Sequence, residues 1–409
     1  MNLQEAQKKL AQYSQEHILK YYEELSTTEQ AHLLKQIDET DFSVVEQIKK
    51  PSGINKAQGV ITPIKAMQIP EIEANREAFT QTGLAAIRQG SVAAVLLAGG
   101  MGTRLGSDHP KGMYDIGLTK PVYIFERIIS NLLDVVRQAD TWIHLFIMTS
   151  DKNHQDTTSF FQAHDFFGYR AEYIHFFQQD MAPASTYEGQ VYLEDKYKIA
   201  TSPNGNGGWF SSLQNAGLMD LIRMNHIEWL NVFAVDNVLQ RIADPCFVGA
   251  TISQNCSVGA KVVRKNDPDE KVGVMCLKDG HPSIVEYYEQ TPQLRDTKDE
   301  NGDPAYNFGV ILNYLFRISS LEAICKTEMP LHIVEKKIPF IDDDANPVNP
   351  TEPNGYKFET LILDMIELMD TCLPFEVERE KEFAPIKNKT GVDSVESARM
   401  LLQKNGITL

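Results

Sequence analysis

The sequence predicts an α/β fold: a doubly wound, mostly parallel sheet, with a helical N-terminal segment before it and a small C-terminal α+β part after it. The first observation behind this prediction is a series of short apolar runs, at residues 92–97, 142–148, 173–177 and 229–235. Helical stretches separate these runs, notably 122–136 and 211–225. Such alternation is typical of parallel sheets covered by helices on both faces. The second observation is a glycine-rich loop directly after the first run, at the strand end where such sheets bind ligands.

The N-terminal part favours helices. Residues 1–50 predict two amphipathic helices, and a capping box between Ser26 and Glu29 would open the second. Three prolines and two glycines in residues 51–70 indicate a linker. A helix over residues 71–89 would then lead into the first strand of the sheet.

The pattern changes after Lys261. Apolar runs at residues 272–277 and 283–288 flank Lys278-Asp279-Gly280-His281, which indicates a β-hairpin. Residues 291–305 are polar and predict a loop. The tail predicts a helix, a strand and a helix, at residues 359–371, 375–377 and 395–403. We expect three consecutive parts: an N-terminal helical segment, a central ligand-binding domain and a short C-terminal segment, at residues 1–70, 71–345 and 346–409.

Composition excludes several classes of partner. The 409 residues carry 39 basic and 56 acidic side chains, a net charge of −17, which argues against nucleic acid or an anionic membrane as the main partner. The five cysteines are scattered and never spaced as Cys-x-x-Cys, which favours reduced thiols over disulfides or a zinc site. No apolar stretch reaches the roughly 20 residues of a membrane span. We therefore expect a soluble, cytoplasmic protein.

The glycine-rich loop after residue 97 predicts a phosphate-binding site. Gly99, Gly100 and Gly102 allow backbone N–H groups to approach a ligand closely. Arg104 and Lys111 then add two cations at the position where triphosphate oxygens would lie. The alternative is a strand-to-helix turn with solvated cations. The loop is neither the Gly-x-Gly-x-x-Gly dinucleotide fingerprint nor a P-loop.

Two further segments offer polar groups. Asp236 follows the apolar run at 229–235, where a carboxylate can hold Mg²⁺; the alternative is an N-cap for the next helix. A second glycine-rich loop, Asn204-Gly205-Asn206-Gly207-Gly208, could close over a base or a sugar, and the alternative is a surface turn.

The loop residues carry a family resemblance. Leu-Ala-Gly-Gly-Met-Gly-Thr-Arg-Leu-Gly at 97–106, followed by Pro-Lys-Gly-Met at 110–113, resembles the eukaryotic-type UDP-sugar pyrophosphorylases, and within them the UDP-N-acetylhexosamine pyrophosphorylases. The resemblance extends to about Lys387. It implies a Rossmann-like nucleotidyltransferase fold, similar to glycosyltransferase A, and a uridylyltransferase that makes UDP-sugar and pyrophosphate from UTP and a sugar 1-phosphate. N-acetylglucosamine 1-phosphate is the sugar that it implies.

The same resemblance implies roles for individual residues. It places UTP contacts at Leu97, Ala98, Gly99, Gly100, Lys111, Gln179, Gly205, Asp236 and Lys357. It places sugar contacts at Asn206, Glu286 and Tyr287. It makes Asp236 the Mg²⁺ ligand. It places catalytic cations at Arg104, Lys111 and Lys387.

One departure and three alternatives remain open. A sugar-contacting asparagine of the family is replaced here by Val310, which cannot form a hydrogen bond through its side chain. The chain could therefore use glucose 1-phosphate. It could also be a non-catalytic UDP-sugar-binding regulator, although the lysines and Arg104 are retained. A glycosyltransferase would usually show Asp-x-Asp, whereas Asn237 and Val238 follow Asp236.

Overall fold

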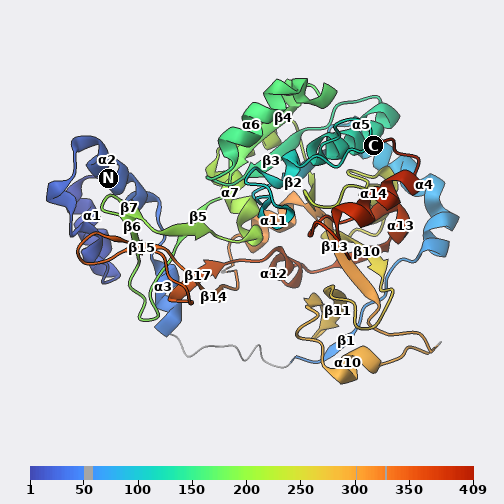
Figure 1. Cartoon of the computed structure of the whole chain (residues 1–409). Coiled ribbons are helices and arrows are strands. Elements are labelled where there is room, and N and C mark those ends of the chain that lie inside the picture. The colour runs from blue at the N-terminus through green and yellow to red at the C-terminus, as the bar shows by residue number, and fades with distance from the viewer. Residues whose placement is uncertain (50–58, 301, 328) are drawn as a thin grey trace. The chain divides into compact units, whose positions relative to one another are not determined.

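The computed structural model describes residues 1–49, 59–300, 302–327 and 329–409 (Figure 1). Contacts between Cα atoms divide the chain into two compact units. The first unit combines three segments, Met1–Gln58, Asp180–Gly208 and Met329–Ile362. The second unit combines Gly59–Gln179, Trp209–Glu328 and Leu363–Leu409.

The second unit contains a large mixed sheet. Its main strand order within the described residues is β1-β11-β13-β9-β2-β3-β4, and β10, β12 and β18 attach to this path. The central strands β2 (Val92–Leu97), β3 (Leu145–Thr149), β4 (Ile174–Gln178) and β9 (Trp229–Ala234) are parallel to one another. The other strands are β1 (Ile61–Pro63), β10 (Val258–Arg264), β11 (Val274–Lys278), β12 (His281–Val285), β13 (Phe308–Arg317) and β18 (Cys372–Glu376). β11 pairs in antiparallel register with β1, β12 and β13, and β13 pairs in antiparallel register with β9 and β10. The α/β class and the parallel core are confirmed, while the sheet as a whole is mixed.

Helices of the second unit connect these strands. They are α4 (Ile69–Arg88), α5 (Ile124–Ala139), α6 (His154–Ala163), α7 (Trp209–Asn215), α8 (Met219–Met224), α9 (Pro245–Ser253), α10 (Pro292–Asp296), α11 (Ile318–Ile324), α13 (Arg379–Glu382) and α14 (Val395–Lys404). A further helix, α12 (Ile362–Glu367), begins at the boundary between the units. None of the helices within the described residues is both long enough and apolar enough to cross a membrane.

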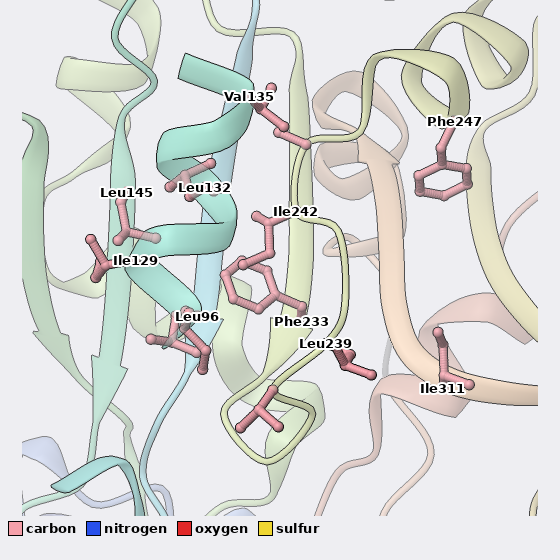
Figure 2. Close-up of a cluster of buried hydrophobic side chains, with 14 of the residues drawn as sticks. Leu96, Ile129, Leu132, Val135, Leu145, Phe233, Leu239, Ile242, Phe247 and Ile311 are labelled. Carbon is pink, nitrogen blue, oxygen red and sulfur yellow. The ribbon is translucent and has the colours of Figure 1, made fainter. Parts of the chain in front are cut away.

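Helix α5 forms part of the main hydrophobic core. Its apolar side chains recur every three or four residues, so that one face carries Ile129, Leu132 and Val135. Figure 2 shows these side chains beside those of Leu145 and Phe233 from the sheet. Each such side chain contributes roughly 1.5–3 kcal/mol when it is fully buried. This packing fixes the sheet edge from which the functional loops emerge.

The first unit is built from helices and two-stranded sheets. The helices are α1 (Leu3–Gln12), α2 (Thr27–Glu39) and α3 (Ser43–Glu46). Two strand pairs are β5 (Met181–Pro183) with β8 (Thr201–Pro203) and β6 (Leu193–Asp195) with β7 (Lys198–Ile199). The other two are β14 (His332–Lys336) with β17 (Gly355–Glu359) and β15 (Phe340–Ile341) with β16 (Pro347–Val348). The predicted capping box is confirmed, because Ser26 and Glu29 exchange side-chain and backbone hydrogen bonds.

Several predicted elements change in detail. The hairpin is confirmed: β11 and β12 pair in antiparallel register, and Asp279 and Gly280 form its turn with φ of 52° and 86°. A single helix over 211–225 is wrong, because Gly217 adopts a φ of 75° and separates α7 from α8.

The loop predicted at 291–305 contains the short helix α10, which Thr291 caps by accepting a hydrogen bond from Leu294 N–H. The helix predicted at 359–371 is confined to α12. Residues 51–58 of the predicted linker lie outside the described residues, and β1 occupies a later part of it.

Candidate active site

The carboxyl ends of the parallel strands of the second unit bring the glycine-rich loop and the Asp236 loop to one edge of the sheet. Leu97, the last residue of β2, pairs with Ala234, the last residue of β9. Val235 N–H donates to the Leu97 carbonyl oxygen at 3.3 Å. The loops that carry Arg104 and Asp236 therefore start side by side, as expected for ligand loops of a parallel sheet.

The glycine-rich loop folds back on itself. Lys111 N–H donates to the Gly100 carbonyl oxygen at 3.1 Å, and Gly102 N–H donates to the His109 carbonyl oxygen at 2.8 Å. Arg104 lies on the short 3₁₀ turn Thr103–Leu105 and is exposed. The closed loop places Lys111 back beside Gly100, although eleven residues separate them along the chain.

Gln179 lies against this loop. Its backbone N–H donates to the Thr149 carbonyl oxygen at 2.8 Å, at the carboxyl end of β3. A Cβ atom on Gly99 would lie 3.2 Å from the Gln179 side-chain oxygen, so the glycine allows this close approach. Around Gly100 a Cβ atom would meet no atom within 4 Å. The loop therefore has an amide beside Gly99 and open space beside Gly100.

Charged groups converge on Lys111. Burial lowers the pKa of its ammonium below the ordinary 10.5. The carboxylate of Asp236 opposes this shift, and the positive charges of Arg104 and Lys387 add to it. The charges of Arg104, Asp236 and Lys387, which come from three segments of the chain, thus act on Lys111. A polyanion at this position would stabilise the charged lysine.

The loop that carries Asp236 is fixed by hydrogen bonds of the neighbouring Asn237, and Asp236 does not cap the next helix. That helix, α9, has Asp244 as its N-cap, so the N-cap alternative for Asp236 is wrong. Asn237 is buried; its side-chain oxygen accepts a hydrogen bond from Ala384 N–H at 2.9 Å, and its amide donates to the Glu382 carbonyl oxygen at 2.7 Å. These bonds fix the loop and leave the Asp236 carboxylate half-exposed.

A metal at Asp236 would need ligands beyond the protein. The described residues contain no cluster of three or more His, Cys, Asp or Glu side chains that could hold a metal ion. Mg²⁺ is commonly bound by one or two carboxylates together with phosphate oxygens and water. A single half-exposed carboxylate among phosphate-attracting cations fits this kind of site.

The first unit carries the second glycine-rich loop and Lys357. Gly205 has a φ of 86°, and a Cβ atom there would lie 2.2 Å from the Thr360 carbonyl oxygen, which only glycine allows. The Asn206 side-chain oxygen accepts a hydrogen bond from Ile362 N–H at 3.0 Å. Lys357 lies on β17 opposite Val334 and is half-exposed. Asn206 thus has a structural role through its side-chain oxygen, and its amide N–H groups are the part of the side chain that could donate to a ligand.

Glu286 and Tyr287 directly follow β12. The Tyr287 side chain is 44% exposed and makes an edge contact with Tyr288. Val310 N–H donates to the Gly273 carbonyl oxygen at 2.9 Å, and a Cβ atom on Gly273 would lie 3.3 Å from a Glu286 carboxylate oxygen. The structure therefore brings Glu286 and Val310 together around Gly273.

Comparison with known proteins shows the family of this chain. A sequence model of the family described as UTP–glucose-1-phosphate uridylyltransferase matches residues 43–409. The chain belongs to this uridylyltransferase family. The members of such a family are nucleotidyltransferases.

Named relatives match over most of this uridylyltransferase. The chain is 34% identical over 406 residues to "UDP-N-acetylhexosamine pyrophosphorylase-like protein 1" of Mus musculus, which covers 94% of this chain and 80% of the relative. It is 34% identical over 417 residues to the UDP-N-acetylglucosamine pyrophosphorylase of Saccharomyces cerevisiae, covering 97% and 86%. The solved structure of the uridine diphosphate N-acetylglucosamine pyrophosphorylase from Trypanosoma brucei matches with a TM-score of 0.84 and 27% identity, covering 97% and 83%.

Buried amides that the sequence prediction missed support the Asp236 loop of this uridylyltransferase. Asn231 donates to the Asn313 side chain at 2.8 Å and accepts from Ala243 N–H at 2.7 Å. Gln240 accepts from Asn313 at 3.1 Å and donates to the Asn237 carbonyl oxygen at 2.9 Å. The signal was available: Asn231 and Asn313 each interrupt an apolar run, where a polar side chain needs a partner.

Proposed function

We propose that this chain joins UTP and a sugar 1-phosphate to give UDP-sugar and pyrophosphate, with N-acetylglucosamine 1-phosphate as its sugar. The observation that carries the proposal is that the loops of Arg104, Lys111 and Asp236 leave adjacent strands, and that Ile386, next to Lys387, is hydrogen-bonded to the Asp236 backbone. The family assignment and the names of the relatives support the same reaction.

In the proposed reaction, a phosphate oxygen of the sugar 1-phosphate attacks the α-phosphorus of UTP in line, and pyrophosphate leaves on the opposite side. No covalent bond to the protein is needed, so the protein contributes positioning and charge stabilisation. Arg104 and Lys111 neutralise charge on the α-phosphate and the leaving pyrophosphate. Lys387 adds a third cation, and its ion pair with Asp393 at 2.9 Å orients it.

Mg²⁺ is the proposed metal, held by Asp236 together with phosphate oxygens. When bound there it would neutralise phosphate charge and orient the triphosphate. The Asn237 hydrogen bonds keep the Asp236 carboxylate in position for that role.

Selection of the substrates is assigned to backbone groups and polar side chains. We assign uridine recognition to the backbone of Leu97, Ala98, Gly99 and Gly100 with Gln179 and Gly205, and a further nucleotide contact to Lys357. We assign sugar recognition to Glu286, Tyr287 and the amide N–H groups of Asn206. Amides and carboxylates suit uracil edges and sugar hydroxyls.

Glucose 1-phosphate is the second candidate sugar. The observation that favours it is the apolar residue Val310, where the resembled family has an asparagine. Its backbone is hydrogen-bonded to Gly273, next to which Glu286 also lies. Loss of one hydrogen-bonding side chain can change discrimination between sugars by a factor of ten or more, on the order of 1–3 kcal/mol.

Three finer assignments belong to the same proposal. The strand order β4-β3-β2-β9 supports a doubly wound, Rossmann-like arrangement. The five cysteines form no disulfide with one another, which supports a reducing, cytoplasmic location. The three consecutive domains of the sequence analysis also stay a prediction.

Pyrophosphate release tests the proposal. Purified protein with UTP and Mg²⁺ would receive N-acetylglucosamine, N-acetylgalactosamine, glucose or galactose 1-phosphate in separate reactions. We expect release to be fastest with N-acetylglucosamine 1-phosphate. Fastest release with glucose 1-phosphate would replace the proposed sugar, and no release with any sugar, from protein that binds UDP-sugar, would favour the non-catalytic regulator.

A further inference from the structure

The second unit contains a cavity of about 750 Å³ outside the residues assigned to the substrates. Its walls come from α4, α5, the segment 239–244 and the segment 375–382, with Asn405 and Ile407 closing one side. Cavities of 300–1,000 Å³ are typical of small-molecule sites. None of the residues assigned above to UTP, the sugar or the metal lines it.

The charges on the cavity wall are almost completely paired. Six lining carboxylates each have a cation within 4 Å: Glu73, Asp134, Asp244, Glu376, Glu378 and Glu382. The wall therefore presents ion pairs and amides, and only a small unbalanced charge.

Arg127 on α5 is the exception. Within the part of the chain that the structure describes, no carboxylate lies at ion-pair distance from it. Its Nε–H is shielded from solvent and has no acceptor. Burial lowers the pKa of its guanidinium, and the charges of Asp134 and Glu126 oppose that shift from a greater distance. A buried donor without a partner costs about 1–3 kcal/mol, so an acceptor here would be stabilising.

A guanidinium of this kind selects an oxyanion. One of its nitrogens, Nη2, already donates to the Asn131 side chain at 2.7 Å. The remaining N–H groups form the planar fork that matches two oxygens of a phosphate or a carboxylate. The apolar side chains of Ile69, Ile72 and Ile407 also line the cavity, beside which the carbon skeleton of a small organic anion could lie.

Asn131 connects Arg127 to the loop that carries Asp236. Its amide donates to the carbonyl oxygens of Val238 and Gln240 at 3.0 Å and 3.1 Å. Figure 2 shows Ile242 of the same segment beside Phe233 of β9, in the hydrophobic core that also includes Leu132 of α5. A ligand that moves Arg127 therefore acts, through one side chain, on the backbone only a few residues from Asp236.

We propose that this cavity binds a small metabolite through a phosphate or carboxylate group held by Arg127, and that binding is coupled through Asn131 to the Asp236 loop. The binding half of the proposal does not depend on the function proposed above. The coupling half rests on that function, because it requires a nucleotide beside Asp236.

Calorimetric titration of the full chain tests the binding half. The probes are inorganic phosphate and citrate, added to protein saturated with UDP so that the nucleotide position is filled. The variants are Arg127→Gln and Arg127→Lys. The matched control is Arg137→Gln, which removes an exposed arginine of the same helix that pairs with Asp134 but does not itself line the cavity.

We expect saturable binding of one probe to wild type and to Arg137→Gln. We expect Arg127→Gln to lose that binding and Arg127→Lys to weaken it about tenfold or more, because lysine lacks the fork. Binding of phosphate alone indicates a phosphorylated metabolite, and binding of citrate alone a carboxylate. No saturable binding of either probe, or equal affinity in Arg127→Lys and wild type, would overturn the proposal. Thermal unfolding checks each fold, and Arg127→Lys decides the matter if Arg127→Gln does not fold.

The coupling half is measured by UDP affinity with and without a saturating probe. We expect at least a twofold change in wild type and none in Arg127→Gln. Probe binding that leaves UDP affinity unchanged in wild type would overturn the coupling alone. Protein that binds the probe at Arg127 but releases no pyrophosphate would contradict the proposed function and still support the anion site.

Discussion

Ile386 N–H donates to the backbone carbonyl oxygen of Asp236 at 2.9 Å. This bond joins the loop after β9 to a segment of the chain 150 residues later, and Lys387 is the next residue. The proposed metal ligand and the proposed third cation are therefore positioned by one backbone contact. Charges from distant parts of the chain are placed before substrate binds, as electrostatic catalysis requires.

Lys111→Ala is predicted to lower kcat by roughly 10²–10³, the usual effect of removing one group that stabilises developing charge. The matched control is Lys120→Ala, an exposed lysine that follows the same loop. Initial rates of pyrophosphate release and circular dichroism spectra check rate and fold. Equal rates for both variants would remove Lys111 from the mechanism.

The pH dependence of kcat/KM should reflect the Lys111 ammonium. Because burial lowers its pKa in the protein, the charged form is lost on the alkaline side below pH 10.5, and activity should fall there as pH rises. Lys111→Arg should move this alkaline limb to higher pH, since a guanidinium stays charged. A limb that does not move in Lys111→Arg would belong to another group.

Asp236→Asn is predicted to weaken the apparent Mg²⁺ affinity about tenfold or more, because a neutral amide replaces the carboxylate. Asp108→Asn, at an exposed position of the glycine-rich loop, is the control. Titration of the reaction rate with Mg²⁺ measures both variants. An unchanged Mg²⁺ dependence in Asp236→Asn would contradict the proposed ligand.

Asn237→Ala is predicted to destabilise the fold by about 2–4 kcal/mol, because it leaves a buried N–H and a buried carbonyl without their partners. Denaturant unfolding of the variant and of wild type gives this difference. A change below about 0.5 kcal/mol would show that water replaces the lost bonds.

Val310→Asn is predicted to change the ratio of kcat/KM for N-acetylglucosamine and glucose 1-phosphates by about tenfold in either direction. Residue 310 and Glu286, the proposed sugar contact, both lie next to Gly273. Steady-state kinetics with both sugars measures the ratio, and an unchanged ratio would place the sugar elsewhere.

The parallel core could be predicted because buried strands show continuous apolar runs of four to eight residues. The glycine-rich loop and Asp236 could be predicted as neighbours because the carboxyl ends of such strands share one edge. The antiparallel part of the mixed sheet could not be predicted. β13 pairs with β9, β10 and β11, and nothing local in its sequence specifies these distant partners.

The supporting residues were harder to predict than the charged ones. The convergence of Arg104, Lys111 and Asp236 follows from loops that leave adjacent strands. The hydrogen bonds of Asn237 reach Glu382 and Ala384, which lie far along the chain, so their partners could not be inferred from spacing. Helix ends were misjudged where a single positive φ decides the outcome, as at Gly217.

Mass spectrometry of the products tests the central claim most directly. Wild type and Lys111→Ala would be incubated with UTP, N-acetylglucosamine 1-phosphate and Mg²⁺. The account predicts equimolar UDP-N-acetylglucosamine and pyrophosphate from wild type, formed at a rate lower by roughly 10²–10³ in the variant. UTP that stays unconsumed by wild type, or a UDP-sugar that forms equally fast with Lys111→Ala, would contradict it.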